Sequence, residues 1–186
     1  MPRLSYVDAA TASEPVARTL NKLAAPLNIF KLMAHAEGNF RPLVKYAGTV
    51  LSEQELDARL RELIIQLVAQ INHGEYEWVQ HVPIGLRCGC TQEEIDAIAE
   101  ERLTADCFSD RDKATLAFAR QVIEQVKADD ATFAAVAAHL SQREIVETIL
   151  TCGTYMMMAR LTENAECELD LPAGDALMDR LESGGR

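Results

Sequence analysis

The sequence has no run of apolar residues that approaches the ~20 needed for a helix to cross a bilayer. Its opening stretch, MPRLSYVDAATASEP, also lacks the charged start, apolar middle and small-residue cleavage site of a secretory signal. We therefore expect a cytoplasmic protein with no membrane partner.

Positive charge is scarce, because 18 Lys and Arg residues stand against 29 Asp and Glu residues and give a formal charge of -11. A polyanion is repelled by such a field unless a local basic patch opposes it. No such patch is visible in the sequence. We therefore expect no nucleic-acid partner.

Cysteine spacing shows none of the regularity of a disulfide framework. The five cysteines are odd in number and irregularly placed, at Cys88, Cys90, Cys107, Cys152 and Cys167. Structural disulfides occur in even numbers and in oxidising compartments. We therefore expect mostly free thiols.

Runs of alternating β-branched residues are absent too, and helical spacing dominates, which predicts an all-α chain. No linker rich in Gly, Pro or Ser interrupts residues 50–165, so we expect one domain over residues 1–186. Expected helices lie near residues 14–25, before Gly38, from 42, after the capping box of Thr91 and Glu94, at 110–127, and at 142–163 after the capping box of Ser141 and Glu144.

The most regular pattern is DARLRELIIQLVAQIN, whose apolar residues form a helical stripe with further apolar residues on the opposite side. Such a helix is usually buried on more than one face. A tight turn at 72–74 follows, in which Gly74 can take a conformation closed to other residues. The next helix runs to Gly89, with Trp78, Val82 and Leu86 on one side, so the two helices form an antiparallel hairpin.

A second face of that helix gathers Glu77, His81, Ile84 and Cys88, since each residue advances by ~100°. Residues four apart are neighbours on a helix, so Glu77 can accept a hydrogen bond from His81 and fix its tautomer. Pairing the hairpin also places Glu62 about 4–5 Å along the axis from His81. Glu62 would join the pair only if both faces line a common cavity, closed by another helix or subunit.

Three other interpretations of these residues stay open. Glu77 and His81 could be a half-exposed surface pair worth a few tenths of a kcal/mol. A metal site from His73, Glu77 and His81 is disfavoured, because ~12 Å separates the first from the last along one helix; we expect no metal. A redox site is disfavoured because Cys88 lies ~10 Å from His81 and only Gly89 separates it from Cys90.

The segment RELIIQLVAQINHGEYEWVQHVPIGLRCGCTQEEIDAI, within residues 56–100, resembles the carboxymuconolactone decarboxylase family, which includes alkylhydroperoxidase D-like proteins. The shared pattern is an arginine–glutamate opening, an apolar helix, a turn, a helix with a functional histidine, and an acidic capping segment. The resemblance implies an alkylhydroperoxidase D-like helical bundle built around a central antiparallel helix hairpin. Glu62 and His81 match the family's glutamate and histidine. The Cys-x-x-Cys positions of the hydroperoxidase branch hold Gly74 and Glu77, so the peroxidatic dithiol is missing.

The resemblance implies a homo-oligomer, a trimer or hexamer with pockets at subunit contacts, and a decarboxylase-like lyase that uses no cofactor on a small lactone or carboxylated substrate. Glu62, Glu77 and His81 would be catalytic, with His81 as the acid and Glu77 orienting it. The pocket would be shaped by Tyr76 and Trp78, and an anionic substrate bound by Arg61, Arg87 or Arg160. Two alternatives remain: a peroxidase or thiol reductase that uses Cys88 or Cys90, and a non-catalytic oligomeric binding protein.

Overall fold

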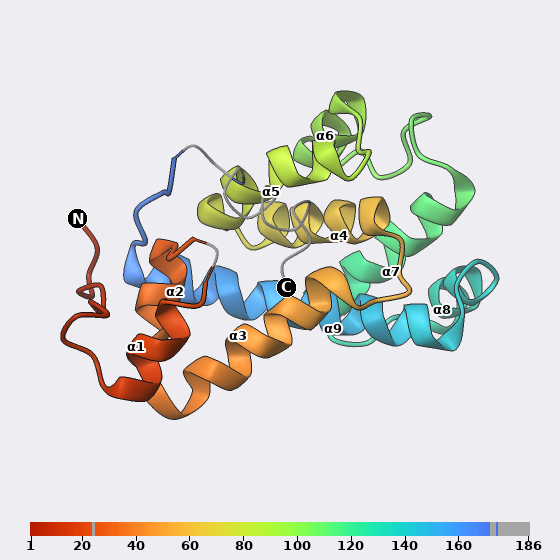
Figure 1. The fold of residues 1–186 in the computed structure, drawn as a ribbon. Helices are drawn as coiled ribbons and strands as arrows, with labels where there is room; N and C mark the ends of the chain where they lie inside the picture. The colour runs from red at the N-terminus through yellow and green to blue at the C-terminus, as the bar shows by residue number, and fades with distance from the viewer. Residues whose placement is uncertain (24, 172–173, 175–186) are drawn as a thin grey trace.

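The computed structural model describes residues 1–23, 25–171 and 174, and these residues form α-helices and no strand (Figure 1). The predicted all-α fold is therefore confirmed. The helices are α1 (Glu14–Leu20), α2 (Asn28–Met33), α3 (Glu37–Ser52), α4 (Ala58–Ile71), α5 (Glu75–Arg87), α6 (Gln92–Ala99), α7 (Asp110–Gln125), α8 (Asp130–Ala137) and α9 (Gln142–Ala165). None of the helices in the described ranges is long and apolar enough to cross a membrane.

The centre of the molecule is α4, which lies between α5 and α6 on one side and α9 on the other (Figure 1). Asp57 caps its first turn by accepting a hydrogen bond from the Leu60 backbone N–H at 3.1 Å. Every residue from Leu60 to Ala69 is buried, as the apolar pattern on both sides of this helix predicts. The first residues of the hairpin are therefore held inside the core.

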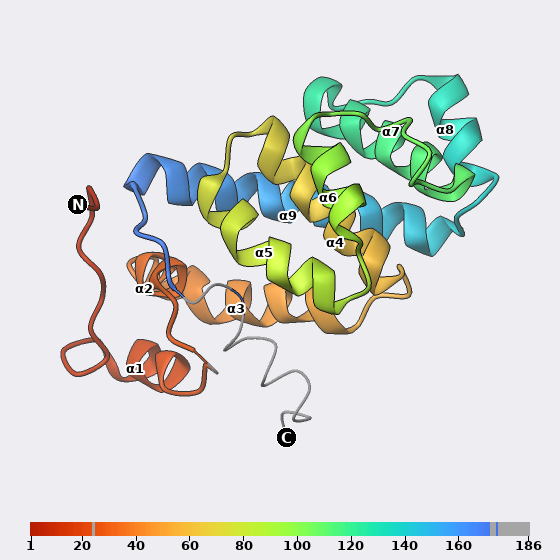
Figure 2. The same ribbon diagram turned by 90° about the horizontal axis from the view of Figure 1, so that it is seen from above.

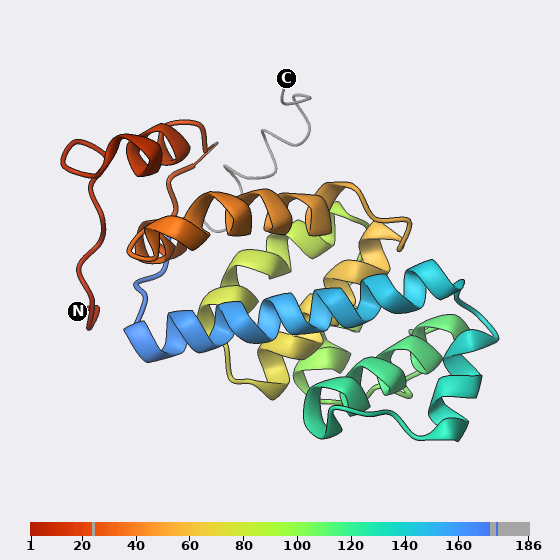
Figure 3. The same cartoon turned by 90° about the horizontal axis from the view of Figure 1, so that it is seen from below.

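The longest helix, α9, crosses the molecule from end to end beside α3 (Figure 3). Its start has the predicted capping box, in which Ser141 and Glu144 satisfy each other's backbone N–H groups. The short helices α1 and α2 lie at one end of the molecule, and α7 and α8 at the other (Figures 1 and 2). Side chains of α9 can therefore reach both ends of the α4–α5 hairpin.

The turn between α4 and α5 differs from the prediction. His73, not Gly74, takes the left-handed conformation, with a φ of 54°. Gly74 is required for space instead, since a Cβ there would lie 2.8 Å from a carboxylate oxygen of Glu77 and 3.0 Å from the Cβ of Ala159. The absence of a side chain at residue 74 thus makes room for a carboxylate one turn later.

Two helix boundaries near the N-terminus were also predicted wrongly. The first helix ends at Leu20, five residues early, and α3 begins at Glu37, so that Gly38 and Pro42 lie inside it. Proline removes one intrahelical hydrogen bond. Phe40, which is 0% exposed, anchors the first turn of α3 in the core, and this packing outweighs the local sequence signal.

Candidate active site

The hairpin brings Glu62 of α4 and His81 of α5 into contact. Oε2 of Glu62 lies 2.8 Å from Nδ1 of His81. Glu62 is 0% exposed and His81 is 7% exposed, so the contact is shielded from bulk water. A hydrogen bond to a charged group is stronger in such surroundings than in water.

Arg61 occupies the other oxygen of the same carboxylate. Its Nε and Nη2 donate to Oε1 of Glu62 at 3.3 and 3.2 Å. The Glu62 carboxyl group therefore lies between a guanidinium and an imidazole, and it faces Nδ1 of His81, so that an N–H on this nitrogen has an acceptor in place. Arg61 was predicted as a possible substrate-binding cation, but its charge is committed to Glu62.

Glu77 does not have the predicted hydrogen bond to His81. Both of its carboxylate oxygens lie 3.0 Å from Oγ1 of Thr162, which donates from α9. Glu77 is 3% exposed, and this burial raises the pKa of its carboxyl, although the bond from Thr162 and the nearby His81 lower it. A helical wheel of one helix cannot show that a neighbouring helix supplies the partner.

A cavity of about 80 Å³ lies beside these groups, with walls from α2, α3, α5 and α9. Glu77 and His81 both face it, while Glu62 lies behind the His81 ring and does not line it. The rings of Tyr155 and His81 pack edge to face, with centroids 4.8 Å apart. The predicted common chamber therefore contains an imidazole and one carboxyl, and the second carboxyl orients the imidazole from behind.

A larger surface cleft, of about 500 Å³, lies between the N-terminal segment and α1 and α2. Its lining includes Tyr6, Asp8 and Lys31 but none of the residues of the hairpin. Lys31 is engaged by Asn28, 3.2 Å away, and stands over the Tyr6 ring. The smaller cavity is the candidate active site, because the paired titratable groups are there.

The remaining predicted pocket residues are divided between the cavity and the surface. Tyr76 lines the cavity. Trp78 is partly exposed and packs against the main core, outside the cavity lining. The reason is that α5 turns its polar face inward and its apolar face outward, so that Leu86 is 42% exposed. Arg87 is exposed, and Arg160 donates to Asn72 at 2.9 Å. Neither arginine is among the described residues that line the cavity.

The thiols lie in surroundings that disfavour the thiolate. Burial raises the pKa of Cys90 to about 12, and its Sγ donates weakly to the Arg59 carbonyl at 3.5 Å. Burial likewise raises the pKa of Cys88, which is half-buried, and that of Cys152 to about 12. Within the described ranges, no three or more His, Cys, Asp or Glu side chains are grouped so that they could hold a metal ion.

Three residues of the site were missed at the sequence level. Thr162 and Tyr155 come from α9, far along the chain from α5, and Asp170 follows α9 and binds Tyr76. Their only sequence signal is a position on a long helix, or just after it, with no spacing that links them to the hairpin.

The fold is similar to several solved structures, each covering most of the chain. The alkylhydroperoxidase AhpD core of an uncharacterized peroxidase-related protein from Ralstonia eutropha JMP134 has a TM-score of 0.79 at 20% identity, over 91% of this chain and 93% of that one. A peroxidase-related protein from Silicibacter sp. TM1040 has a TM-score of 0.73 at 16% identity, over 89% and 97%. A cysteine-to-alanine variant of the debrominase Bmp8, in complex with 2,3,4-tribromopyrrole, has a TM-score of 0.70 at 18% identity, over 96% and 95%.

At these identities the likeness concerns the fold alone. No curated protein matches the sequence. The model of the carboxymuconolactone decarboxylase family matches residues 38–121, which include α4, its turn and α5. The match to the carboxymuconolactone decarboxylase family model thus includes the helix hairpin that joins Glu62 to His81, and the fold is alkylhydroperoxidase D-like, without the Cys-x-x-Cys pair.

Proposed function

We propose that this chain is a decarboxylase-like lyase that performs acid/base chemistry without a cofactor on a small lactone or carboxylated molecule. The observation that carries the proposal is the buried contact of Glu62 with Nδ1 of His81, 2.8 Å long. A carboxylate behind one ring nitrogen fixes the tautomer, so that Nε2 exchanges protons with a molecule in the cavity.

His81 can serve in both protonation states. With Nε2 unprotonated, the ring accepts a proton from the reacting molecule. With Nε2 protonated, the imidazolium would lie against the Glu62 carboxyl group and give a carboxylated substrate a positive partner in an apolar cavity. The same imidazolium is then a proton donor to carbon.

Loss of carbon dioxide requires two events that this site can support. The bond between the carboxylate carbon and the ring carbon breaks, and its electron pair is delocalised into the adjacent carbonyl as an enolate. A proton is then delivered to that carbon from His81. Glu77, whose raised pKa favours the neutral carboxyl, can return a proton to the site or hydrogen-bond the enolate oxygen.

We also propose that the enzyme is a homo-oligomer. Four apolar side chains on the outer face of α9 are exposed by 39% to 54%, and these are Val146, Ile149, Leu150 and Met157. They follow the helical period, with Gly153 open between them. Contiguous apolar surface of this kind favours a partner, and light scattering after size-exclusion chromatography will show a trimer or hexamer if a second copy covers it.

The test of the function begins with ligand discovery. Lactones and carboxylates that raise the melting temperature bind the folded state, whatever the chemistry. The binders are then assayed for turnover and carbon dioxide release with His81→Gln and with His139→Gln, a control at an exposed residue. We expect His81→Gln to lose turnover and His139→Gln to keep it. Full turnover by His81→Gln would refute the proposal.

A further inference from the structure

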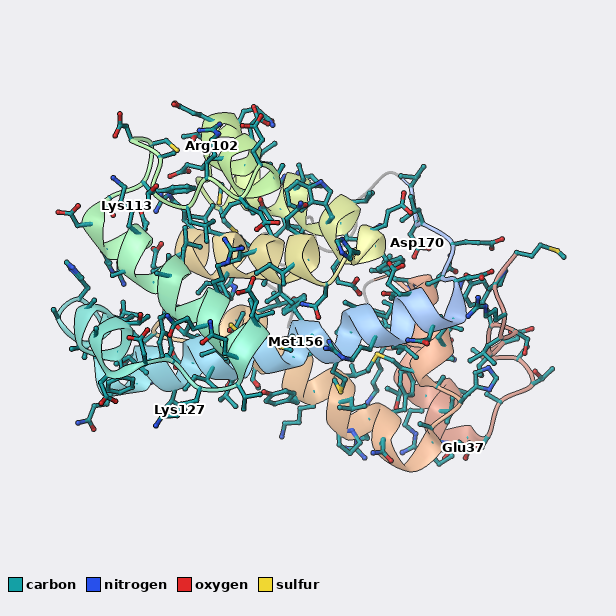
Figure 4. The ribbon with its side chains drawn as sticks, turned by 180° about the vertical axis from the view of Figure 1, so that it is seen from behind. Glu37, Arg102, Lys113, Lys127, Met156 and Asp170 are labelled. Carbon is teal, nitrogen blue, oxygen red and sulfur yellow. The ribbon has the colours of Figure 1, made fainter. Side chains whose placement is uncertain are left out.

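The segment after α9 contacts both α2 and α5. Asn28, at the start of α2, donates from its side chain to the Glu168 carbonyl at 3.1 Å. Tyr6, from the N-terminal segment, accepts a hydrogen bond from the Glu168 N–H at 2.9 Å. Figure 4 labels Asp170 in this segment, beyond the end of α9.

Asp170 joins the two helices through one carboxylate oxygen. Its Oδ2 accepts a hydrogen bond from the Tyr76 hydroxyl at 2.7 Å and from the Asn28 backbone N–H at 2.8 Å. Tyr76 lines the cavity on α5, and the residues on each side of Asn28, Leu27 and Ile29, line it on the side of α2. A single carboxylate therefore connects two walls of the candidate active site.

Gln80 provides a second connection on the α5 side. Its amide nitrogen donates to the Asp170 carbonyl at 2.7 Å, and its amide oxygen accepts from the Gly174 N–H at 2.9 Å. Gly174 is buried with a φ of 71°, and a Cβ there would lie 2.9 Å from the Gln80 carbonyl. Both polar ends of a cavity-lining side chain are thus used by the C-terminal segment.

The size of the cavity gives this contact a functional meaning. About 80 Å³ is roughly half of the ~150 Å³ in which benzene is bound by an apolar protein cavity. A ring-containing substrate therefore requires a wall to move. The walls from α5 and α9 pack on α4, whereas α2 is a six-residue helix that packs on α3 and α9 and that Asp170 ties to α5.

We propose that Asp170 is a clasp that holds α2 against α5, and that its release sets both the entry and the size limit of molecules reaching His81. Only the identification of the cavity as an active site rests on the proposed function. In this proposal Asp170 and Tyr76 determine which substrate sizes enter the cavity. They take no part in proton transfer.

The test compares Asp170→Ala and Tyr76→Phe with Asp129→Ala. Asp129 also accepts from a backbone N–H, that of Thr132 at 2.7 Å, but it caps α8, at the opposite end of the molecule. Hydrogen exchange is measured on peptides covering residues 28–36, and benzene binding is measured by calorimetry. Loss of a hydrogen bond to a charged group predicts roughly tenfold faster exchange and roughly tenfold tighter benzene binding in Asp170→Ala.

Tyr76→Phe removes only the hydroxyl, so it is expected to change both quantities in the same direction by a smaller factor. It also decides the question if Asp170→Ala fails to fold. Exchange and benzene affinity equal to those of Asp129→Ala in the folded variants would overturn the clasp. Neither measurement uses turnover, so the two proposals can fail separately. If only the clasp is wrong, His81→Gln still loses turnover. If only the enzymatic function is wrong, Asp170→Ala still exchanges faster than Asp129→Ala.

Discussion

Replacement of Glu62 by Gln is the sharpest perturbation of the site, because it keeps the shape of the side chain and changes only its hydrogen bonding. The amide oxygen can still accept from Arg61, which donates to Oε1 at 3.2 and 3.3 Å. The amide nitrogen then faces Nδ1 of His81 and donates to it. The ring must switch its proton to Nε2, the nitrogen that should exchange protons with the substrate.

Two magnitudes follow from this change. A histidine held in the wrong tautomer by an isosteric amide loses about 10⁴-fold in turnover in a well-studied triad, so we expect a loss of about 10³–10⁴-fold here. The free energy of unfolding should fall by about 1–3 kcal/mol, since a buried charged hydrogen bond is lost and Arg61 keeps only a neutral partner. The loss of turnover should thus exceed what the loss of stability explains.

Glu94→Gln is the matched control. Glu94 is also a buried glutamate, 3% exposed and ion-paired with an arginine, Arg59, but it lies on α6 away from the cavity. Urea unfolding gives the stability of both variants, turnover gives the catalytic effect, and ¹⁵N chemical shifts of His81 report the tautomer. Equal turnover in the two variants, or a wild-type His81 that carries its proton on Nε2, would refute the assigned role of Glu62.

Three further predictions concern packing, thiol reactivity and pH. Gly74→Ala should lower the free energy of unfolding by about 1–3 kcal/mol, because its Cβ meets Glu77 and Ala159. Gly48→Ala, inside α3 and with nothing within 4 Å of its Cβ, should raise it by about 0.5–1 kcal/mol; urea unfolding measures both. Cys90, with a pKa of about 12 against 9.0 for a free thiol, should react with iodoacetamide at pH 8 roughly a thousandfold more slowly than an ordinary thiol, and rapid labelling seen by mass spectrometry would contradict its burial. The raised pKa of Glu77 means that the folded state keeps its proton to a higher pH than the unfolded state, so the free energy of unfolding falls as pH rises above the ordinary value of 4.5. Glu77→Gln should therefore gain stability relative to wild type over that rise. Curves of the free energy of unfolding against pH that run parallel for the two proteins would rule this out.

The helical fold could be predicted because its signals are local. The capping box of Ser141 and Glu144 begins α9 as predicted, and the apolar pattern around α4 identified the most buried helix. The antiparallel register of the hairpin brought Glu62 near His81, which needs only the rise per residue of two helices.

The errors in the site come from contacts between helices that are distant in sequence. The expected partner of His81 was Glu77, four residues away, but Glu62 takes that place and Thr162 of α9 binds Glu77. Trp78 was expected to shape the pocket, whereas the polar side of α5 is the more buried one and Trp78 lies outside the cavity lining. Apolar periodicity does not identify a buried helix face that carries polar residues. Such residues can be buried because they are hydrogen-bonded to each other.

Glu62 lies in the buried part of α4, Leu60–Ala69, so one side of the candidate site is fixed while the other can be adjusted. A residue embedded in this way cannot be displaced without disturbing the core, so the pair of Glu62 and His81 is constrained against change. The facing wall from α2 is short and lies at the end of the molecule, in a core cluster separate from the one that contains the apolar residues of α4. New substrates could therefore be acquired by altering that wall alone, with the reaction centre inherited unchanged.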